Sequence, residues 1–526
     1  MFFCARVAGT VLKALLTEKG FFFDQKLKKS EKEKKMRFEQ FRELAVEYDF
    51  IPVYEVMTAD LYTPVIAYLK LRREGRQSFL LETVEGKETL GRYSFIGIDP
   101  VKVISNRGMM LSVTENGVAA TSRKNIFDYL KEDLHTKKHP VLAELPAFTG
   151  GTVGFIGYEN ISLVESRIKY DEGDDVLPDS ILGVYETVVA FDHYKHRMII
   201  ISNAAVTPGC DLQATYSGAK SKIRGIKQEL REDLHYSSHF KFGRDVAVSI
   251  EDPRFHELVE KCKENIVEGD IFQIVLSKRF SAGYTGDLFS VYRALRMINP
   301  SPYMYFLEFT DGLTIIGTSP ENLVKVKDGM VEVMPIAGTR KRGATPEEDA
   351  KLEEGLVNDP KEQAEHVMLV DLGRNDVGRV SEFGTVEVVE KMNIHRFSHV
   401  MHIVSRVRGK LRGDLDCIDA LKSCFPAGTV SGAPKIRAME LIAGYENQRR
   451  NVYAGAVGYI DLSGNLDVCI AIRTLFARDG VINWQAGAGI VADSIPRLES
   501  KEINNKSAVL RNALELAEVV DEDSGN

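Results

Sequence analysis

The sequence predicts an α+β protein with large, mainly antiparallel sheets flanked by helices. Strand-like runs of β-branched and aromatic residues dominate the first half of the chain, and long helical patterns alternate with strands in the second half. The two kinds of element do not repeat as strict strand–helix units, which argues against a doubly wound parallel sheet. The clearest strand patterns are SFLLETV (78–84), VKVIS (101–105), TVVAF (187–191) and RMIIIS (197–202).

Length and composition predict a chain of two large domains or three smaller ones. The chain has 526 residues, of which 44% are hydrophobic and 27% charged, as is typical of globular proteins. We expect an N-terminal domain at residues 36–240 and a C-terminal domain at 249–522. The polar segment 213–244 reads as a helical connector without a strand pattern. The strongest helix patterns lie at 253–270, 347–357, 361–376 and 501–520.

Residues 1–35 differ in composition from the rest of the chain. They carry nine Lys or Arg against four acids, a net charge of +5, whereas the remainder carries about −13. KLKKSEKEKK (26–35) is rich in Lys and acids rather than in Arg and Ser, and no small-residue cleavage site follows an apolar core. A targeting peptide therefore remains the weaker alternative. We favour an extension that is disordered or not native, with Met36 as the natural start.

Charge and cysteine content point to a cytoplasmic protein that acts on a small molecule. The net charge is −8, and Arg and Lys are spread among the acids, which argues against nucleic acid as the main ligand. The six cysteines form no CxxC pair, so neither a zinc site nor a disulfide framework is supported. Arg6 and Lys13 interrupt the most apolar stretch, so we expect no membrane span.

Two acidic helix faces are the first candidates for chemistry. In NDPKEQAEHVM (358–368), Asp359 is a good N-cap, Pro360 suits the first helical position, and an acid follows at Glu362. Glu362 and Glu365 then share one face of the predicted helix. A capping role alone explains Glu362, so Glu365 is the better candidate for a metal ligand.

A second acidic face lies near the end of the chain. In IPRLESKEINNK (495–506), Glu499, Glu502 and Lys506 follow one another at helical spacing. Like-charged neighbours on a helix cost ~0.2–0.5 kcal/mol each, so solvent or a cation has to offset the repulsion. Magnesium takes oxygen ligands of this kind, but a solvated helix face accounts for the same pattern, and the residues alone leave both open.

Two glycine-rich stretches resemble phosphate-binding loops without matching them. FPAGTVSGAPK (425–435) has three residues between Gly428 and Gly432, and Ile follows Lys435, so the spacing of a nucleotide-binding P-loop is missing. QAGAGIV (485–491) also lacks the dinucleotide-binding spacing. We expect a tight turn there, with carboxylate binding as the alternative.

The three histidines of HRFSHVMHIVSRV (395–407) suggest two readings. His395 and His399 stand at helical i, i+4 spacing, but the Glu of a zinc-binding HExxH motif is missing. VMHIVSRV alternates as a strand does, which places His402 on one face with Val400 and Val404. A structural histidine is the favoured interpretation from these residues alone.

Eight motifs in order resemble the large subunits of anthranilate synthase. The resemblance spans residues 37–520 and rests on GRYSFIG (91–97), GDIFQIVLS (269–277), PSPYMYFLE (300–308), GTSPENLV (317–324), PIAGTR (335–340), EHVMLVDLGRND (365–376), FPAGTVSGAPKIRAME (425–440) and QAGAGIVADSIPRLESKE (485–502). It implies an α+β fold of two interleaved domains, with chorismate bound in the C-terminal half.

The resemblance also assigns a magnesium site and a substrate site. Glu365 and Glu502 are expected to ligate Mg²⁺ directly, with Glu362 and Glu499 acting through water, so that the ion holds the ring carboxylate of chorismate. The residues expected to bind substrate are Gly338, Thr339, Tyr453, Arg473, Gly487, Ala488, Gly489 and Lys506. Among them, Tyr453, Arg473 and the backbone at 487–489 would hold the enolpyruvyl carboxylate.

Four residues match catalytic positions of the family. Glu321 matches the general acid that protonates the departing 4-hydroxyl while ammonia adds to the ring, giving aminodeoxyisochorismate. Pyruvate is then eliminated with loss of the C2 proton. His402 matches the active-site histidine, and its role stays open between the two steps. Gln273 and Thr429 complete the catalytic set.

Two positions separate this chain from its relatives. Isochorismate and salicylate synthases carry a Lys base at the position of Gln273, and an amide cannot activate water in its place. Aminodeoxychorismate synthases, the runner-up, typically carry a nucleophilic Lys at the position of Ala337. A catalytically silent, tryptophan-responsive partner is a third reading, but the chain keeps all four glutamates together with the catalytic residues.

The resemblance further implies feedback by tryptophan and a second subunit. The feedback site corresponds to Leu80, Leu81, Glu82, Thr83, Pro302, Tyr303 and Met304. Thr83 stands where the family has Ser, and Lys341 replaces a usual proline. No Cys lies in the Gly-x-Cys-x-Gly elbow of a glutaminase. Ammonia is therefore expected from a separate glutamine amidotransferase, in a heterotetramer of two large and two small subunits.

Overall fold

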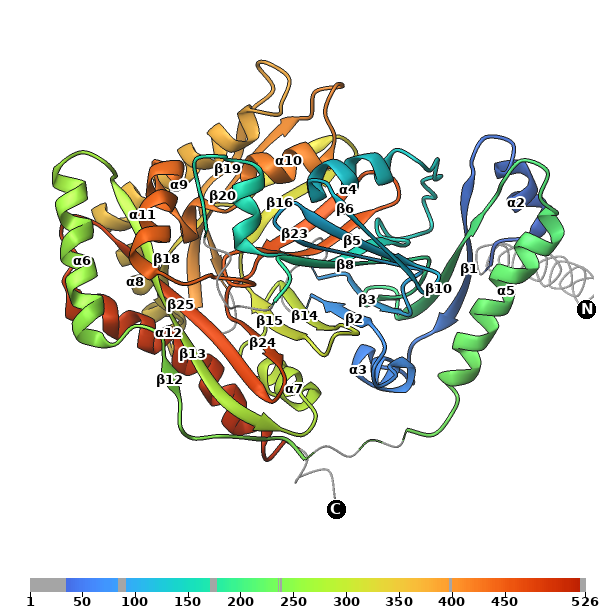
Figure 1. Cartoon of the computed structure of the whole chain (residues 1–526), viewed down its shortest axis with the longest axis horizontal. Coiled ribbons are helices and arrows are strands. Elements are labelled where there is room, and N and C mark those ends of the chain that lie inside the picture. Colours follow the sequence, from blue (N-terminus) through green and yellow to red (C-terminus); the bar gives the residue numbers. More distant parts are fainter. Residues whose placement is uncertain are drawn as a thin grey trace, which may run out of the picture.

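Two large antiparallel sheets flanked by helices form the molecule (Figure 1). The computed structural model describes residues 35–83, 91–170, 177–234, 236, 239–396 and 400–520. The extension expected at 1–35 lies outside this part of the chain except for Lys35. Each pairing between strands of the described residues is antiparallel. The predicted α+β fold class is confirmed.

The first sheet has 13 strands among the described residues. Its strands follow one another in the order β1 (Phe50–Thr58), β10 (Arg197–Ala205), β9 (Thr187–Asp192), β3 (Tyr93–Ile98), β2 (Ser78–Glu82), β14 (Tyr303–Glu308), β15 (Thr314–Ser319), β24 (Thr474–Arg478), β25 (Val481–Ile490), β13 (Gln273–Thr285) and β11 (Lys241–Phe242). Two short strands, β12 (Ala247–Val248) and β21 (Gly432–Ala433), also pair with β13.

The second sheet has 12 strands in the same part of the chain. Its order is β18 (Ile336–Lys341), β20 (Val400–Lys410), β17 (Met330–Val333), β16 (Asn322–Lys327), β23 (Leu466–Ile470), β22 (Ala456–Asp461), β7 (Gly151–Ile156), β8 (Ser180–Tyr185), β4 (Lys102–Arg107), β5 (Met110–Glu115) and β6 (Val118–Arg123). Strand β19 (Glu387–Arg396) pairs with β20.

Both sheets combine strands from the two halves of the sequence. In the first sheet β2 pairs with β14, and in the second β7 pairs with β22. Neither half therefore completes a sheet by itself, which is the interleaving expected of the fold. The predicted boundary near residues 240–249 falls at the short strands β11 and β12, on the edge of the first sheet.

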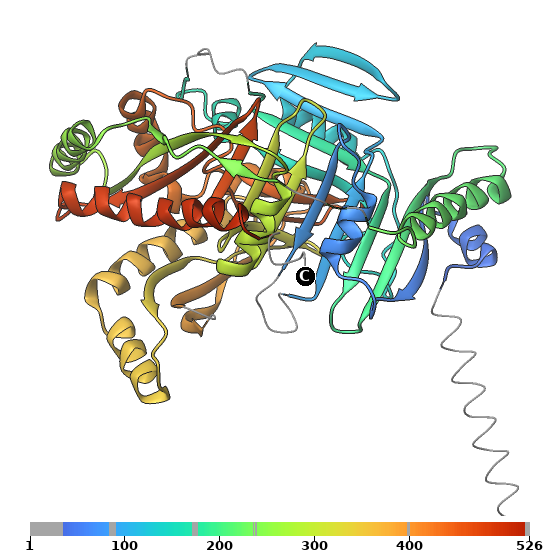
Figure 2. The ribbon, with the colours of Figure 1, turned by 90° about the horizontal axis from the view of Figure 1, so that it is seen from below.

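Helices cover the ends and faces of the sheets (Figure 1). They are α2 (Phe38–Leu44), α3 (Pro64–Leu71), α4 (Ile126–Leu134), α5 (Leu212–Glu229), α6 (Asp252–Val267), α7 (Phe289–Ile298), α8 (Pro346–Val357), α9 (Pro360–Gly378), α10 (Cys417–Cys424), α11 (Lys435–Glu446) and α12 (Pro496–Ala517), with 3₁₀ turns η1 (Tyr158–Leu163) and η2 (Gly428–Val430). Figure 2 shows α8 and α9, in yellow-orange, projecting from the body of the molecule. No helix of the described residues is both long and apolar enough to span a membrane.

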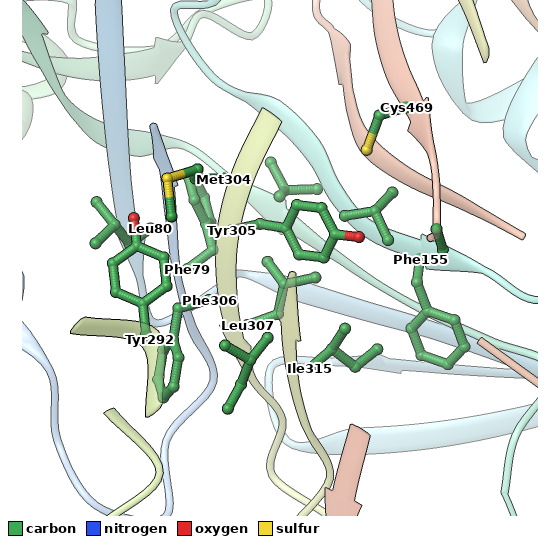
Figure 3. Close-up of a cluster of buried hydrophobic side chains, with 14 of the residues drawn as sticks. Phe79, Leu80, Phe155, Tyr292, Met304, Tyr305, Phe306, Leu307, Ile315 and Cys469 are labelled. Atoms are coloured by element: carbon green, nitrogen blue, oxygen red, sulfur yellow. The ribbon is translucent and has the colours of Figure 1, made fainter. Parts of the chain in front are cut away.

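The main core lies between the two sheets. Figure 3 shows Phe79 and Phe306, from the first sheet, gathered with Phe155 and Cys469, from the second. These four side chains are each no more than 1% exposed. At about 25 cal/mol per Å² of buried apolar surface, such a layer fixes how the sheets lie against each other and so positions the loops at their edges.

Most local predictions are confirmed, and two are wrong. The four strand patterns form β2, β4, β9 and β10, and the helix patterns form α6, α8, α9 and α12. The connector at 213–244 contains α5 but also the two-residue strand β11, which pairs with the end of β13. QAGAGIV is not a turn: it forms the end of β25, where neighbouring side chains lie too close for a Cβ at two positions.

Candidate active site

A cavity of about 340 Å³ opens where α9, α12, β13, β18, β20 and β25 meet. Among the residues predicted from the sequence, it is lined by Gln273, Glu321, Gly338, Thr339, Glu365, His402, Thr429, Tyr453, Arg473, Gly487, Gly489, Glu499, Glu502 and Lys506. Residues more than 230 positions apart in the chain, such as Gln273 and Lys506, thus supply one site. Of the residues predicted for catalysis, substrate binding and metal binding, Glu362 and Ala488 do not line the cavity.

Glu321 lies in the wall of this cavity, in the loop before β16. Thr429 Oγ1, from η2, donates a hydrogen bond of 3.0 Å to Glu321 Oε2. Burial raises the pKa of Glu321, and the hydrogen bond from Thr429 and the charge of Arg473 only partly oppose that rise. A carboxyl with a raised pKa retains its proton more readily near neutral pH, as a general acid must.

Arg473 stands between β23 and β24 with a left-handed backbone. Its φ is +49°, a conformation that non-glycine residues seldom adopt and that is costly outside turns unless the surrounding structure holds it. Burial lowers the pKa of Arg473, while Glu321 raises it. Its Nη1 donates to Asn299 Oδ1 at 3.3 Å. The guanidinium is therefore held at the Glu321 side of the cavity, where it can pair with a carboxylate.

Two glycines of β25 leave room for side chains that line the cavity. A Cβ on Gly487 would lie 2.6 Å from Tyr453 Oη, and a Cβ on Gly489 would lie 2.6 Å from Gln273 Nε2. Neither distance is compatible with a side chain. The glycines are therefore needed for the close approach of Tyr453 and Gln273, and this is the physical reason for the sequence QAGAGIV.

The same glycines present backbone N–H groups to the cavity. Val275, which faces Gly489 across the ladder, donates its N–H to Ser431 O on the opposite side (2.9 Å), so this pair is not hydrogen-bonded. The N–H groups of Gly487 and Gly489 thus point away from β13. The alternation of the ladder places the N–H of Ala488 against β13, so the free donors come from the two glycines.

His402, in the middle of β20, is held in one orientation. Its Nδ1 donates to Gly338 O at 2.9 Å and lies 3.1 Å from Thr339 Oγ1. Burial lowers the pKa of His402, so the ring is neutral near pH 7, with its proton on Nδ1 and a lone pair on Nε2. The strand prediction for His402 is confirmed, and its ring lies in the cavity wall.

Position 338 requires a glycine for a different reason. Its φ is +63°, at a register shift between β18 and β20. A Cβ there would lie 2.8 Å from Leu356 Cδ1 and 3.0 Å from Glu362 Oε2. The bulge turns the Gly338 carbonyl toward His402, which explains why a glycine precedes the lining residue Thr339.

Helix α9 begins as the sequence predicts. Asp359 caps it by accepting from the N–H groups of Lys361 (3.0 Å) and Glu362 (3.4 Å), and Pro360 is its first residue. Glu365, one turn further on, lines the cavity. Glu362 is turned toward Arg340, whose Nη1 lies 3.2 Å from Glu362 Oε1.

Helix α12 brings the second acidic face to the same cavity. Glu499, Glu502 and Lys506 all line it, and Lys506 Nζ bridges Glu502 Oε1 (2.8 Å) and Gly487 O (3.0 Å). The pKa of Glu365 is raised, mainly by burial and also by the charges of Glu362 and Glu502. Glu365, Glu499 and Glu502 thus bring carboxylates from two helices to one part of the cavity lining, its acidic end.

The acidic end has the chemistry of a site for a hard divalent cation. In the described residues, no three His, Cys, Asp or Glu side chains stand close enough together to hold a metal ion as they lie. Magnesium, however, commonly takes one or two carboxylates and completes its shell with water and substrate oxygens. Glu365 and Glu502, on two helices facing one cavity, fit that donor set once Glu502 turns from Lys506.

A buried ion pair that the sequence did not reveal connects segments that line the cavity. Arg450 and Glu446, i, i+4 at the end of α11, are each 1% exposed in their side chains and 2.6 Å apart. Arg450 donates to Val430 O (2.7 Å) and Val275 O (2.8 Å), while Glu446 Oε1 accepts from the N–H of Ser277 (2.8 Å). The pair joins α11, η2 and β13. Its i, i+4 spacing was the only local signal.

A second cavity, of about 560 Å³, holds most of the residues predicted for feedback. Those that line it are Leu81, Glu82, Thr83, Tyr303 and Met304. Pro302 precedes β14 without lining the cavity, and Leu80 is buried in the core.

The polar groups of this second cavity are tied to the core of both sheets. Tyr303 Oη donates to Asp467 Oδ1 (2.9 Å) and accepts from Asn322 Nδ2 (3.0 Å), beside Glu321 in the chain. Buried Glu82 accepts from Tyr292.

Comparisons with known proteins show the family of the chain. The family described as chorismate binding enzyme matches residues 77–512. Anthranilate synthase component 1 of Acetivibrio thermocellus is 46% identical over 483 residues, 90% of this chain and 97% of that protein. The protein of the same name from Aquifex aeolicus is 44% identical over 498 residues, 92% of this chain and 98% of the relative.

Solved structures of related enzymes have a similar fold. Anthranilate synthase component I from Streptococcus pneumoniae TIGR4 superposes with a TM-score of 0.69 at 40% identity, covering 86% of this chain and 98% of that one. The menaquinone-specific isochorismate synthase of Escherichia coli, at 19% identity and a TM-score of 0.66, covers 91% of this chain and 98% of that one, and shares the fold.

Proposed function

The chain belongs to the family of chorismate binding enzymes, and we propose that it is the large subunit of an anthranilate synthase, which converts chorismate and ammonia into anthranilate and pyruvate. The observation that carries this proposal is the cavity whose lining brings Glu321, His402 and Arg473 together with the acidic residues of α9 and α12. An acid, a neutral base and a carboxylate partner are the groups this reaction needs.

The substrate is a dianion, and the cavity offers separate partners for its two carboxylates. Arg473, Tyr453 and the N–H groups of Gly487 and Gly489 would bind the enolpyruvyl carboxylate at one end. Lys506 donates a hydrogen bond to Gly487 O and so helps to hold this part of β25 in place. Gly338 and Thr339 close the side of the cavity next to His402.

Amination exchanges the 4-hydroxyl of chorismate for an amino group at C2. Glu321 gives its proton to the departing hydroxyl, which leaves as water, while the lone pair of ammonia forms the new C–N bond. The added amine then loses one proton, so the step consumes no net proton and returns Glu321 to its protonated form. Aminodeoxyisochorismate is the product.

Elimination restores the aromatic ring. The C2 proton is removed, the bond between ring C3 and the enolpyruvyl oxygen breaks, and the released enolpyruvate takes up a proton to become pyruvate, which leaves anthranilate. His402 is suited to accept a proton, because it is neutral and its Nδ1–H is already donated to Gly338 O. Both the amine deprotonation and the C2 proton loss need such an acceptor, and His402 serves one or both.

We assign Mg²⁺ to the acidic end of the cavity. Glu365 and Glu502 would ligate the ion directly, and Glu362 and Glu499 would act through water. When bound, the ion neutralises the ring carboxylate and so lets a dianion lie beside four glutamates. To act on the ion through water, Glu362 would have to give up its ion pair with Arg340.

Two side chains of the cavity favour this reaction over those of related enzymes. Gln273 and Ala337 both line it, at the positions where relatives carry a Lys that activates water or attacks the ring. An amide and a methyl group do neither. Ammonia addition without a covalent intermediate is the chemistry that remains.

The wider setting follows from the same proposal. The reaction is the first committed step of tryptophan biosynthesis, in the cytoplasm, and tryptophan would inhibit it from the second cavity. The relatives are named component 1, in line with a separate glutaminase subunit that supplies ammonia. We propose a heterotetramer of two large and two small subunits.

A single assay tests the proposal. The purified chain is incubated with chorismate, Mg²⁺ and an ammonium salt at mildly alkaline pH, and anthranilate is followed by its fluorescence and mass. Product is expected without glutamine and without a second subunit. Tryptophan added to the same mixture is expected to lower the rate, whereas binding without inhibition would refute the feedback role.

A further inference from the structure

Lys361 occupies a position that helix stability does not favour. It is the second residue of α9, directly after Pro360, in an exposed place. A cation in the first turn of a helix interacts unfavourably with the helix dipole, by ~0.3–1 kcal/mol. Among the described residues, its ammonium forms neither a hydrogen bond nor an ion pair with another side chain. Local stability therefore does not explain a lysine here.

The side chain of Lys361 lines the same cavity as the acidic helix faces. Its charge acts on Glu365 and on Glu499, lowering the pKa of both, while burial and the neighbouring carboxylates raise them. Lys361 therefore lies at the acidic end of the cavity, where its charge acts on carboxylates of both α9 and α12.

The other cations of the cavity already have partners. Arg473 interacts with Glu321, donates to Asn299 and is assigned above to the enolpyruvyl carboxylate. Lys506 is paired with Glu502 and with the carbonyl of Gly487. In the described chain, Lys361 is thus the cavity-lining cation near the acidic helix faces whose charge is available to a second carboxylate.

We propose that Lys361 is a substrate-binding residue, whose ammonium binds the ring carboxylate of chorismate at the metal end of the cavity. This inference rests on the proposed function, because it takes the substrate to be a dianion with one carboxylate at each end. A lysine on a flexible stem can reach such a carboxylate as a point charge without the fixed geometry that an Arg needs.

The position of Lys361 gives it opposite effects on the two ligands. It attracts the carboxylate of the substrate, but it repels a divalent cation from Glu365 and Glu499. Its removal should therefore weaken chorismate binding and strengthen metal binding. Loss of a metal ligand would weaken both, so the signs separate a substrate-binding lysine from a part of the metal site.

The test compares Lys361→Met, Lys361→Arg and a matched control, Lys501→Met. Lys501 is an exposed lysine of α12, next to Glu502 in the chain but outside the cavity lining. At saturating Mg²⁺ we expect Lys361→Met to raise KM for chorismate about tenfold, equivalent to ~1.4 kcal/mol, with kcat within about twofold. Lys361→Arg should recover most of this loss, and Lys501→Met should match the wild type.

Metal affinity is measured separately, by titration calorimetry with Mn²⁺ in the absence of chorismate. Lys361→Met is expected to bind Mn²⁺ several-fold more tightly than the wild type. Unchanged values of both KM and Mn²⁺ affinity would make Lys361 a solvated surface lysine, and parallel weakening of both would make its role structural. Either result overturns the inference.

Failure of the proposed function gives a different result. In that case neither the wild type nor Lys501→Met forms anthranilate, whatever the Mn²⁺ titration shows. If only the inference about Lys361 is wrong, all variants still form anthranilate and share the same KM for chorismate.

Discussion

Thr429 Oγ1 donates a hydrogen bond of 3.0 Å to Glu321 Oε2. The two residues are 108 positions apart in the chain, and η2 and the loop before β16 bring them together. This contact lowers the pKa of a carboxyl that burial raises. The balance of the two effects decides over which pH range Glu321 is an acid.

Thr429→Val should shift the pH dependence of kcat to higher pH. Glu321 acts as an acid only while protonated, so activity falls as pH rises through its pKa. Removal of the hydrogen bond from Thr429 raises that pKa further, and the alkaline limb of the profile moves up. The other charges near Glu321 are Arg473, Lys506 and Glu365, and they are unchanged in this variant.

The matched variant is Thr429→Ser, which keeps the donor and should keep the wild-type profile. The pH profile of kcat at saturating chorismate, measured from pH 6 to 10, gives the comparison. A shift toward lower pH in Thr429→Val would contradict the assignment of Glu321 as the acid.

Glu502→Gln should abolish anthranilate formation by weakening the metal site. The amide keeps the shape of the side chain but removes a negative charge, and a neutral oxygen is a poorer ligand for Mg²⁺. Glu499→Gln, expected to act through water, should lose less activity and recover with added Mg²⁺. The half-saturating Mg²⁺ concentration of each variant is the measurement, and equal losses in both would argue against their different roles.

Gly487→Ala and Gly489→Ala should lower kcat/KM for chorismate while the protein stays folded. The added methyl groups would lie 2.6 Å from Tyr453 Oη and from Gln273 Nε2, so these cavity side chains have to move. Gly283→Ala, in neighbouring β13, meets only Gly480 O at 3.9 Å and serves as the control. Wild-type kcat/KM in both β25 variants would show that the approach of Tyr453 and Gln273 is not needed.

Arg450→Met should destabilise the protein by ~3–5 kcal/mol, because it leaves Glu446 buried without its partner. Both side chains are 1% exposed, and three carbonyl or amide contacts depend on them. The double variant Arg450→Met/Glu446→Leu should recover part of this loss. Urea denaturation measures both, and a loss below ~1 kcal/mol in the single variant would contradict a structural role for the pair.

Local features of the sequence predicted local features of the structure. The N-cap at Asp359 and the helix start at Pro360 depend on neighbouring residues only, and they are found as expected. The acidic faces of α9 and α12 follow from helical spacing in the same way. That both faces meet at one cavity was an expectation from the family resemblance, because spacing within a helix says nothing about its partner.

Features that depend on distant residues were missed or misread. QAGAGIV was expected to be a turn because glycines permit turns, but in β25 they make room for Tyr453 and Gln273, from β13 and a loop elsewhere in the chain. Glu446 and Arg450 resemble an ordinary surface pair in sequence, and only burial between η2 and β13 distinguishes them. Lys361 was overlooked because nothing local marks a cation that lines a cavity.

Anthranilate formation by the purified chain and by Glu321→Gln is the most direct test of the proposed chemistry. With chorismate, Mg²⁺ and ammonium salt, the wild type should form anthranilate and pyruvate, and Glu321→Gln should be slower by about 10²–10⁴-fold at an unchanged KM. Wild-type rates in Glu321→Gln, full activity without a divalent cation, or a product with its amino group para to the carboxylate would contradict the account.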